Sequence, residues 1–510
     1  MLASILSATL VGLEALPVSV EVDIGPGLPS FAIVGLPDAA VQEARERVRA
    51  AIRNSDFAMP PRRTVVNLAP GDRRKEGPAF DLPIALAVLV ATGQLRPDVV
   101  RGYLALGELA LDGSLRPTPG TIAVAQAAGA IGARGLMVPE PNAREAAVVE
   151  EVPVYGCTTL RAAVEHLAGS RPLAPLRAAA GQPPPDPAAP EDLVEVRGQA
   201  AARRALEIAA AGGLNLLLVG PPGVGKTMLA RRLPTILPPL QRAEALEVTT
   251  IYSVAGLLPA YSGLLWRRPF RAPHHTATAS ALIGGGAGSR PGEVTLAHHG
   301  VLFLDELPEF RHDALEALRQ PLEDGVVSVA RAAGTVRHPA RFALIGAMNP
   351  CPCGFRGDPR RECTCTPAQV QRYLARLSGP LLDRIDLHVE VPRPAAIEVL
   401  TGPGGEPSQA VRARVVAARA RAAVREGRAL ARAPRGPARW GLVEPEALAF
   451  LRAASDRLGL GARAMERTLR VARVIADLDA AEAVGSAHVA EALQYRVLDR
   501  ARAPALDTLC

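Results

Sequence analysis

The chain has 510 residues, of which 48% are hydrophobic and 21% are charged. That balance provides apolar material for several cores, and it excludes a wholly disordered chain, a collagen and a disulfide-stapled scaffold. The net charge of +7 permits a polyanionic partner, although only Lys75 and Lys226 among the 58 basic residues are lysine. We expect no membrane contact, because the longest apolar stretch, 82–93, is shorter than the ~20 residues of a spanning helix.

Residues 1–168 mix strand-like and helix-like patterns. Alternating apolar and polar residues predict a half-buried strand over 18–24, and a second strand is predicted over 64–68. The spacing of apolar residues predicts helices over 39–53 and 82–92. These patterns indicate an α/β domain.

A proline-rich stretch at 169–190 separates this region from the rest of the chain. Its run PPPDPAAP can neither pair in a sheet nor continue a helix, so we expect a linker. Residues 191–395 then alternate buried strands with helical segments, which is typical of a parallel α/β sheet. Residues 396–510 show almost only helical patterns. We therefore expect an α/β fold with an N-terminal α/β domain, a parallel α/β core and a C-terminal helical domain.

The strongest motif joins a predicted strand to a predicted helix and fits the pattern G-x-x-x-x-G-K-[ST]. Glycines in such a loop let backbone N–H groups surround phosphate oxygens, and the N-terminus of the following helix favours negative charge. Lys226 would reach the β- and γ-phosphates of ATP, and the Thr227 hydroxyl would bind Mg²⁺. The predicted ATP-binding residues are Gly220, Pro221, Pro222, Gly223, Val224, Gly225, Lys226 and Thr227.

Four further polar residues are candidates for the hydrolytic reaction. Asp305 and Glu306 follow the buried run VLFL; Asp305 would complete the Mg²⁺ site, and Glu306 would polarise the attacking water. Asn349 ends another buried strand and could orient that water. Arg384 follows an apolar helix end between acids, so it is either a local ion-pair partner or a finger aimed at the γ-phosphate of a neighbouring subunit.

Clustered cysteines and histidines are the candidates for metal binding. Two C-x-C pairs can close a tetrahedral Zn²⁺ site, and the alternative is a loop with four reduced thiols. Their clustering favours a metal site in a reducing compartment, so we expect a cytoplasmic protein. The His pairs at 274–275 and 298–299 lack acidic companions, and we interpret them as loop residues. The candidate zinc ligands are Cys351, Cys353, Cys363 and Cys365.

Several longer blocks resemble a known family. They include LNLLLVGPPGVGKTMLA, RPFRAPHHTATASALIGGG, GEVTLAHHGVLFLDELPEF and SGPLLDRIDLHVEVP. Together these look like the magnesium-chelatase-like AAA+ ATPases and, among them, the ComM/YifB competence family. The resemblance covers nearly the whole chain and implies a hexameric ring ATPase with a helical lid over 396–510. For ComM-like members it implies a helicase that acts on single-stranded or branched DNA and drives branch migration in natural transformation.

The same resemblance suggests roles for individual residues. By the family pattern, Asn349 is the sensor 1 residue and Arg384 is the arginine finger. Arg463 is the sensor 2 arginine, although Arg467 and Arg470 share its predicted helix. The rival interpretation is a chelatase-like or chaperone-like ATPase that remodels a protein partner, because it would share every nucleotide-binding residue.

The N-terminal region is also similar to the proteolytic domain of Lon and to its relative in RadA. Lon needs a serine nucleophile and a lysine base. Here the serine place holds Ala79 or Phe80, and the lysine place lies near Thr121 and Ile122. We therefore expect residues 1–168 to form a non-proteolytic domain of ribosomal-S5-like fold.

Two basic segments are candidates for DNA contact. A hairpin is predicted over 326–342, and its Arg331 and Arg337 would contact phosphates unless they lie on a merely solvated face. Residues 412–439 contain nine arginines and one acid. They predict a long helix that either contacts a polyanion or is an ordinary surface helix.

Overall fold

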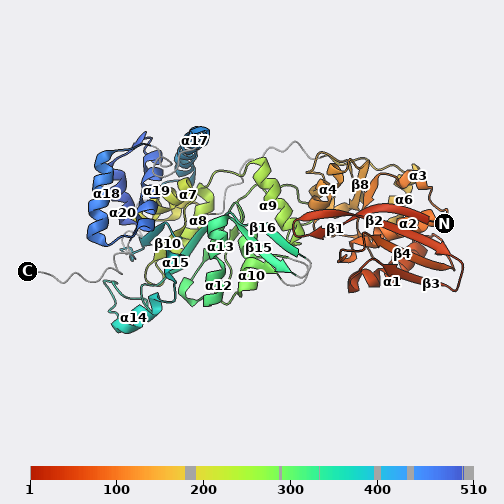
Figure 1. Ribbon diagram of the computed structural model, residues 1–510, viewed down its shortest axis with the longest axis horizontal. Helices are drawn as coiled ribbons and strands as arrows, with labels where there is room; N and C mark the ends of the chain where they lie inside the picture. Colours follow the sequence, from red (N-terminus) through yellow and green to blue (C-terminus); the bar gives the residue numbers. More distant parts are fainter. Residues whose placement is uncertain are drawn as a thin grey trace, which may run out of the picture.

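In the computed structural model of the chain, the described residues are 2–177, 191–285, 290–331, 334–395, 404–432, 442–496 and 498. The molecule is elongated, with an N-terminal α/β unit at one end and a second α/β unit with the C-terminal helices at the other (Figure 1). Among these residues, no helix is long and apolar enough to cross a membrane.

A mixed sheet forms the centre of the N-terminal unit. Its strands are β1 Leu2–Val11, β2 Glu14–Gly25, β3 Ser30–Val34, β4 Arg63–Ala69, β5 Tyr103–Ala105, β8 Gly135–Pro139 and β9 Val154–Cys157. They lie in the order β3-β4-β2-β1-β5-β8-β9. β1 and β2 form a long antiparallel hairpin, and β5, β8 and β9 run parallel. The strands predicted over 18–24 and 64–68 lie within β2 and β4.

Helices pack against this sheet, and two of them match the predictions over 39–53 and 82–92. α1 begins after Asp38, whose carboxylate accepts a 2.8 Å hydrogen bond from the N–H of Val41. Every residue of α2 is buried, as expected for a helix that is apolar on all sides. The elements are α1 Ala39–Asn54, α2 Asp81–Ala91, α3 Pro97–Val100, α4 Thr121–Ala130, α5 Glu140–Ala146 and α6 Leu160–Ala168, with the short strands β6 Glu108–Leu109 and β7 Leu115–Arg116.

The second unit is built on a parallel sheet. Its strands are β10 Leu216–Val219, β11 Phe270–Arg271, β14 Val301–Leu304, β17 Ala343–Met348 and β18 Leu387–Glu390. They lie in the order β11-β14-β17-β10-β18, and every neighbouring pair is parallel. Because parallel strands end at a common edge, the residues that follow β10, β14 and β17 meet there. The predicted parallel α/β core is therefore confirmed.

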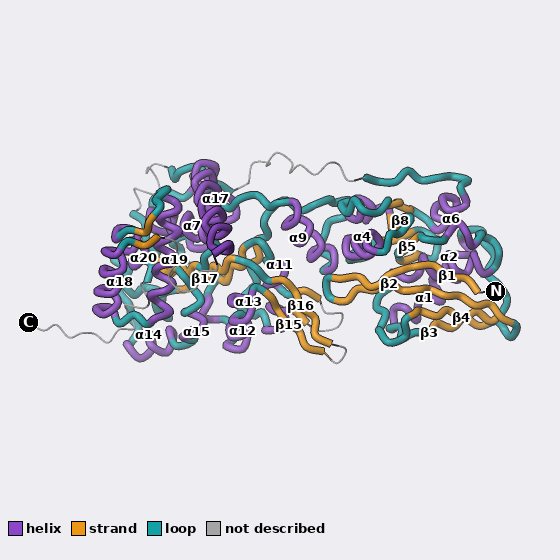
Figure 2. Tube along the Cα trace, turned by 45° about the horizontal axis from the view of Figure 1, so that its top comes forward, coloured by secondary structure: helices purple, strands orange, loops and turns teal. Residues whose placement is uncertain are grey.

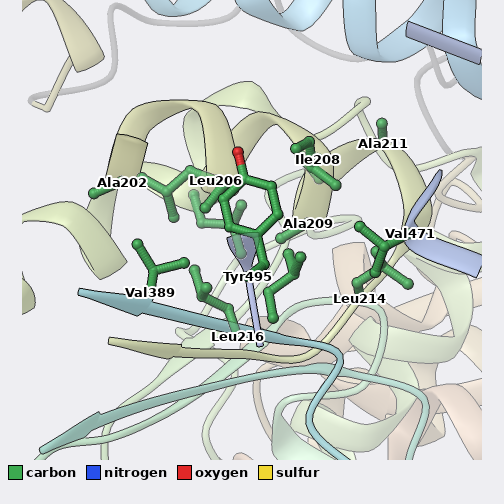
Figure 3. Close-up of a cluster of buried hydrophobic side chains, with 14 of the residues drawn as sticks. Ala202, Leu206, Ile208, Ala209, Ala211, Leu214, Leu216, Val389, Val471 and Tyr495 are labelled. Carbon is green, nitrogen blue, oxygen red and sulfur yellow. The ribbon is translucent and has the colours of Figure 1, made fainter. Parts of the chain in front are cut away.

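Both faces of the parallel sheet are covered. One face packs on helices before and after β10 and on the C-terminal helices; Figure 3 shows Leu216 and Val389 of the sheet beside Leu206, Val471 and Tyr495. The other face packs on shorter helices. The helices and short strands of this unit are α7 Ala200–Gly212, α8 Lys226–Ile236, α9 Arg242–Val254, α10 Ala279–Ile283, β12 Gly284–Gly285, β13 Arg290–Pro291, α11 Glu293–Leu296, α12 His312–Ala317, α13 Arg319–Asp324, α14 Pro367–Leu374 and α15 Gly379–Leu382.

The C-terminal part of the described chain is helical except for one pair of two-residue strands. In its long helix α17, arginines form ion pairs within the chain: Arg414 contacts Glu207 and Glu406, and Arg425 contacts Asp477. These two arginines anchor α17 to α7 and to a later helix. The predicted helix over 412–439 extends past the end of α17, and its side chains from 426 onward lie outside the described residues. The elements are α17 Ser408–Arg432, β19 Leu442–Val443, α18 Pro445–Leu458, α19 Ala462–Leu478, β20 Ala483–Val484 and α20 Ser486–Gln494.

The predicted hairpin is present as an antiparallel ribbon of β15 Val326–Arg331 and β16 Gly334–Pro339. It projects from the second unit (Figure 2). Arg337 lies on β16 opposite Ser328 and is exposed. Arg331 ends β15, and its side chain lies outside the described residues.

The two units touch directly. The N–H of Gly120, which precedes α4, donates to the carbonyl of Ser253 on α9 at 3.0 Å. The hydroxyl of Ser253 donates to the buried carboxylate of Glu145. In the turn between β1 and β2, Gly12 has φ 63°, and a Cβ there would lie 2.5 Å from Cγ1 of Val336 on the ribbon. The N-terminal unit thus packs against both α9 and the β15–β16 ribbon.

Candidate nucleotide-binding site

The loop between β10 and α8 has the backbone geometry of a phosphate cradle. Gly223 and Gly225 have φ values of 76° and 91°, which residues with a Cβ rarely adopt. α8 begins at Lys226 directly after this turn. The first N–H groups of a helix have no partner within the helix, so they are free to bind an anion. The predicted ATP-binding residues Gly220 to Thr227 thus form one continuous turn at the carboxyl edge of the sheet.

Lys226 lies inside this loop. Its Nζ donates to the carbonyl of Gly220 at 2.6 Å, to that of Pro221 at 3.0 Å and to Oδ1 of Asn349 at 3.0 Å. Burial lowers the pKa of the Lys226 ammonium below its usual value. Asn349 follows β17, the strand next to β10, so the parallel sheet brings these two predicted site residues together.

Thr227 and Asp305 form a second contact at the same edge. The hydroxyl of Thr227 donates to Oδ2 of Asp305 at 2.7 Å. Asp305 directly follows β14. A hydroxyl and a carboxylate are oxygen ligands of the kind Mg²⁺ prefers, so this donor set fits the ion.

Glu306 has an unusual backbone and a partner that sequence reasoning missed. Its φ is 51°, and its side chain is 56% exposed. Its Oε2 lies 3.2 Å from Nδ1 of His275. His275 follows β11, the strand next to β14, and its ring lies against that of His274, with centroids 4.1 Å apart and the planes tilted by 34°. The carboxylate beside Thr227 and Asp305 is therefore in contact with a histidine that follows the neighbouring strand.

Arg384 lies at the opposite edge of the sheet. Its carbonyl accepts a 2.8 Å hydrogen bond from Nδ2 of Asn215, the residue before β10. Its Nη1 donates to the carbonyl of Pro380 at 2.7 Å, and its Nη2 contacts the carboxylate of Glu323. β10 is four residues long, about 13 Å at 3.3 Å per residue, so Arg384 is not brought to the P-loop of its own chain.

The arginines of α19 gather at the same amino edge. Nη1 of Arg467 lies 2.9 Å from Asp386, and Nη1 of Arg470 lies 3.5 Å from it. Asp386 is buried and also accepts the N–H of Asn215 at 2.9 Å. Arg463 is 76% exposed and lies 3.7 Å from Asp383, beside Arg384. Of these three arginines, Arg463 is thus the one least committed to an internal contact.

The four clustered cysteines converge on one point. The sulfur of Cys351 lies 3.3 Å from that of Cys353 and 3.6 Å from that of Cys363. Candidate ligand atoms of all four cysteines lie within 4.8 Å of one another. A tetrahedral ion with Zn–S bonds of ~2.3 Å separates its sulfurs by about 3.8 Å, so this arrangement fits Zn²⁺. Backbone hydrogen bonds, first from Phe355, lower the pKa of the Cys353 thiol to about 5.

The His pair at 298–299 has an acidic companion, contrary to our expectation. Nε2 of His298 and Nε2 of His299 each lie 2.9 Å from Oε2 of Glu247 on α9. However, Nδ1 of His298 accepts the N–H of Arg341 at 3.0 Å. A neutral imidazole that accepts at Nδ1 carries its proton on Nε2 and has no lone pair there for a metal. Burial lowers the pKa of His298 to about 4, so its ring is neutral. The cluster anchors α9 to the start of β14.

The N-terminal unit has no nucleophile–base pair at the places suggested by the Lon resemblance. Phe80, Thr121 and Ile122 are buried, and Ala79 is half-buried. Lys75 is also buried, and its Nζ donates to the backbone carbonyls of nearby loop residues. An ammonium that donates to backbone carbonyls secures the loop that carries them.

Comparisons with known proteins agree with this geometry. Family models described as "Magnesium chelatase, subunit ChlI", "Subunit ChlI of Mg-chelatase" and "Magnesium chelatase, subunit ChlI C-terminal" match residues 192–399, 20–142 and 405–496. The YifB protein of Salmonella typhimurium is 44% identical, and the competence protein ComM of Haemophilus influenzae is 43% identical, over 98% of both chains in each case. The magnesium-chelatase 38 kDa subunit of Rhodobacter capsulatus is 26% identical over 36% of this chain and 50% of its own. The chain therefore belongs to the magnesium-chelatase-like AAA+ ATPases, in the group that includes ComM and YifB.

Proposed function

We propose that the chain is an Mg²⁺-dependent ATPase that works as a homo-hexameric ring motor on DNA. It would bind single-stranded or branched DNA and drive branch migration in natural transformation or recombination. The observation that carries this proposal is the division of polar residues between the two edges of one sheet. Lys226, Thr227, Asp305 and Glu306 meet at the carboxyl edge, whereas Arg384 stands at the amino edge.

The chemistry at the carboxyl edge is in-line attack of water on the γ-phosphate. Lys226 would bind the β- and γ-phosphates, and Thr227 and Asp305 would hold Mg²⁺, which supplies charge neutralisation when bound. Glu306 would polarise the water, and Asn349 would orient it. Because Arg384 is distant from this site within its own chain, a neighbouring subunit would supply it. Arg463, exposed beside Arg384, would enter the same neighbouring site.

Two observations support DNA as the partner. The exposed Arg337 stands on a projecting two-stranded ribbon, a shape that can reach a phosphate backbone. The Haemophilus influenzae relative is named a competence protein, and it aligns with this chain over nearly its whole length. A cytoplasmic location suits a DNA motor with reduced cysteines.

The cysteine cluster adds a structural zinc site to this proposal. Closure by four thiolates leaves no open coordination position, so the ion would stabilise residues 351–365 and take no part in hydrolysis. Zn²⁺ is thus proposed as a third cofactor beside ATP and Mg²⁺.

The deciding experiment measures ATP turnover with and without forked or four-way DNA. Turnover should rise with DNA, and Lys226→Ala should abolish it by removing the phosphate-binding cation. Glu306→Gln should still bind ATP but turn it over about a hundredfold more slowly, because only the water-polarising group is removed. Normal turnover by Glu306→Gln would refute this assignment of roles.

The second candidate function is the remodelling of a protein partner. The similarity of the nucleotide-binding region to a magnesium-chelatase subunit favours it. It predicts that ATP turnover responds to a protein and is indifferent to every DNA structure, so the same assay separates the two functions.

A further inference from the structure

Arg384 is already paired within its own subunit. Its Nη2 contacts the carboxylate of Glu323, which lies in the last turn of α13. The side chain of Arg384 is 15% exposed and that of Glu323 is 65% exposed. Nε of Arg384 is buried and has no hydrogen-bond partner among the described residues. The exposed carboxylate of Glu323 is therefore the partner of Nη2 of Arg384.

The surroundings of Glu323 are strongly basic. The hydrogen bond from Arg384 lowers the pKa of Glu323, and the charges of Arg384, Arg463 and Arg319 act in the same direction. A second anion brought to this place would meet the same arginines. A phosphate group carries more charge and offers more acceptor oxygens than one carboxylate, so it can displace Glu323.

Glu323 is also joined to the β15–β16 ribbon. Gly325, two residues later, turns the chain with φ 67°, and its N–H donates to the carbonyl of Pro321 at 3.0 Å. Its carbonyl accepts the N–H of Ala340 at 2.8 Å, which closes the base of the ribbon. A displacement of Glu323 would thus act on the element that carries Arg337.

We propose that Glu323 is the resident counter-ion of Arg384 and that the γ-phosphate of the neighbouring subunit's ATP displaces it when two subunits meet. In an isolated subunit, Arg384 is paired with Glu323. When a neighbouring subunit with bound ATP docks, Arg384 binds the γ-phosphate and Glu323 becomes free. Because Glu323 lies at the base of the β15–β16 ribbon, its release would shift the ribbon. The ribbon carries Arg337, the proposed DNA contact, so its position would depend on whether the neighbouring subunit holds ATP. This inference rests on the proposed supply of Arg384 between subunits.

The test measures subunit assembly by mass photometry across protein concentrations, with and without Mg²⁺ and a non-hydrolysable ATP analogue. Glu323→Gln removes the competing charge and keeps the side-chain shape. It should lower the concentration for half-maximal assembly about two- to fivefold with the analogue, as expected for a largely exposed pair. Without the analogue it should have no effect. Asp324→Asn, the same charge change one residue later on an exposed side chain, is the matched control and should leave assembly unchanged.

The Arg384→Ala background completes the test. There, Glu323→Gln should cause no shift, since its partner is gone. A Glu323→Gln protein that behaves like Asp324→Asn, that assembles less readily, or that keeps its shift in the Arg384→Ala background would overturn the proposal. If the unaltered chain hydrolyses ATP as a monomer and never assembles, the ring motor itself fails, and this inference fails with it.

Discussion

Nδ1 of His275 lies 3.2 Å from Oε2 of Glu306, so a side chain from one strand end holds the carboxylate that follows the adjacent strand. A carboxylate held against a neighbouring side chain has less freedom to turn toward a water molecule than a free one. His275 would thus restrain Glu306 in the chain without DNA. The segment after His275 leads into α10 and the strand pair β12–β13, so a ligand that moves this segment would also move His275.

His275→Ala should therefore raise ATP turnover in the absence of DNA. We expect an increase of up to about tenfold, which corresponds to a change of about 1.4 kcal/mol in the activation barrier. Steady-state phosphate release measures the effect, and DNA should then stimulate the variant less than the unaltered chain. His274→Ala, which removes only the ring that lies against His275, should have the smaller effect. Turnover that falls in His275→Ala as it does in Glu306→Gln would show that His275 assists the reaction.

Two inactive variants should restore activity to each other. Arg384→Ala retains a P-loop with Lys226, and Lys226→Ala retains Arg384, so a mixed ring contains some sites with both groups intact. An arginine finger contributes about 10³–10⁵ in turnover, so each variant alone should be almost inactive. Phosphate release from the mixture, measured after mixed rings are demonstrated, tests this expectation. If mixed rings form but release no phosphate, Arg384 does not act on the ATP site of the neighbouring subunit.

Arg337 should contact DNA phosphates without regard to sequence. Arg337→Ala should weaken binding to all DNA sequences and flatten the log–log dependence of affinity on salt by about 0.7–0.9 for each phosphate that the variant no longer neutralises. Fluorescence anisotropy at several salt concentrations measures the slope. Arg96→Ala, which alters an exposed ion pair in the N-terminal unit, serves as the control. Equal slopes for all three proteins would make Arg337 a solvated surface residue.

The cysteine cluster should hold about one zinc ion per chain in protein purified without chelator, because four thiolates close one tetrahedral site. Elemental analysis measures the content. Cys363→Ser should release the metal, whereas Cys157→Ala should retain it, since Cys157 is buried alone in the N-terminal unit. If no metal is found and all four thiols of the native protein titrate freely, the cluster is not a zinc site.

The buried pair Arg47–Asp81 should make the N-terminal unit sensitive to pH. Nε of Arg47 lies 2.6 Å from Oδ2 of Asp81, yet burial raises the pKa of Asp81 to about 6. Since this folded-state pKa exceeds the unfolded value of ~3.9, the contribution of Asp81 to stability is full below ~3.9 and is lost as the pH rises through about 6. In the folded wild type, the hydrogen bond and the charge of Arg47 lower the pKa of Asp81. Arg47→Met removes this effect, so the folded-state pKa of Asp81 should rise further and its stability contribution should be lost over a pH range that extends higher.

Arg47→Met should therefore destabilise the protein more at pH 8 than at pH 5. At pH 8 the free energy of unfolding should fall by about 3–5 kcal/mol, because a buried carboxylate is left without its partner. Thermal unfolding at both pH values measures the difference. The control is Arg96→Met, which breaks a fully exposed pair and should change nothing measurable. An equal loss of stability at both pH values would indicate that Arg47 contributes by packing alone.

The P-loop and the acids after β14 could be located from the sequence because local geometry dictates them. Glycines at positive φ, a lysine and an apolar strand must follow one another along the chain for a phosphate cradle to form. The contact between His298 and Glu247 could not be found in this way. The two residues are 51 positions apart, and their meeting depends on how α9 packs against the sheet.

The arginines of α17 illustrate a second limit. The amino-acid composition gives the number of charged residues but not which of them form ion pairs. Arg425 pairs with Asp477, which is 52 residues away along the chain. The same limit applies to Arg384. Its flanking acids suggested a local ion pair, but the pair forms with Glu323, 61 residues earlier.

If Arg384 serves a neighbouring subunit as proposed, the placement of Lys226 and Arg384 at opposite edges of one sheet would give each subunit one side that provides an arginine and one side that receives it. In an open row of subunits, the first or last P-loop would always lack an arginine from a neighbour. Only a closed circle, in which the last subunit meets the first, gives every P-loop its partner. A ring that opens to admit a DNA strand would thus leave one ATP site without its arginine. ATP hydrolysis at all sites would resume only after the ring closes around the strand.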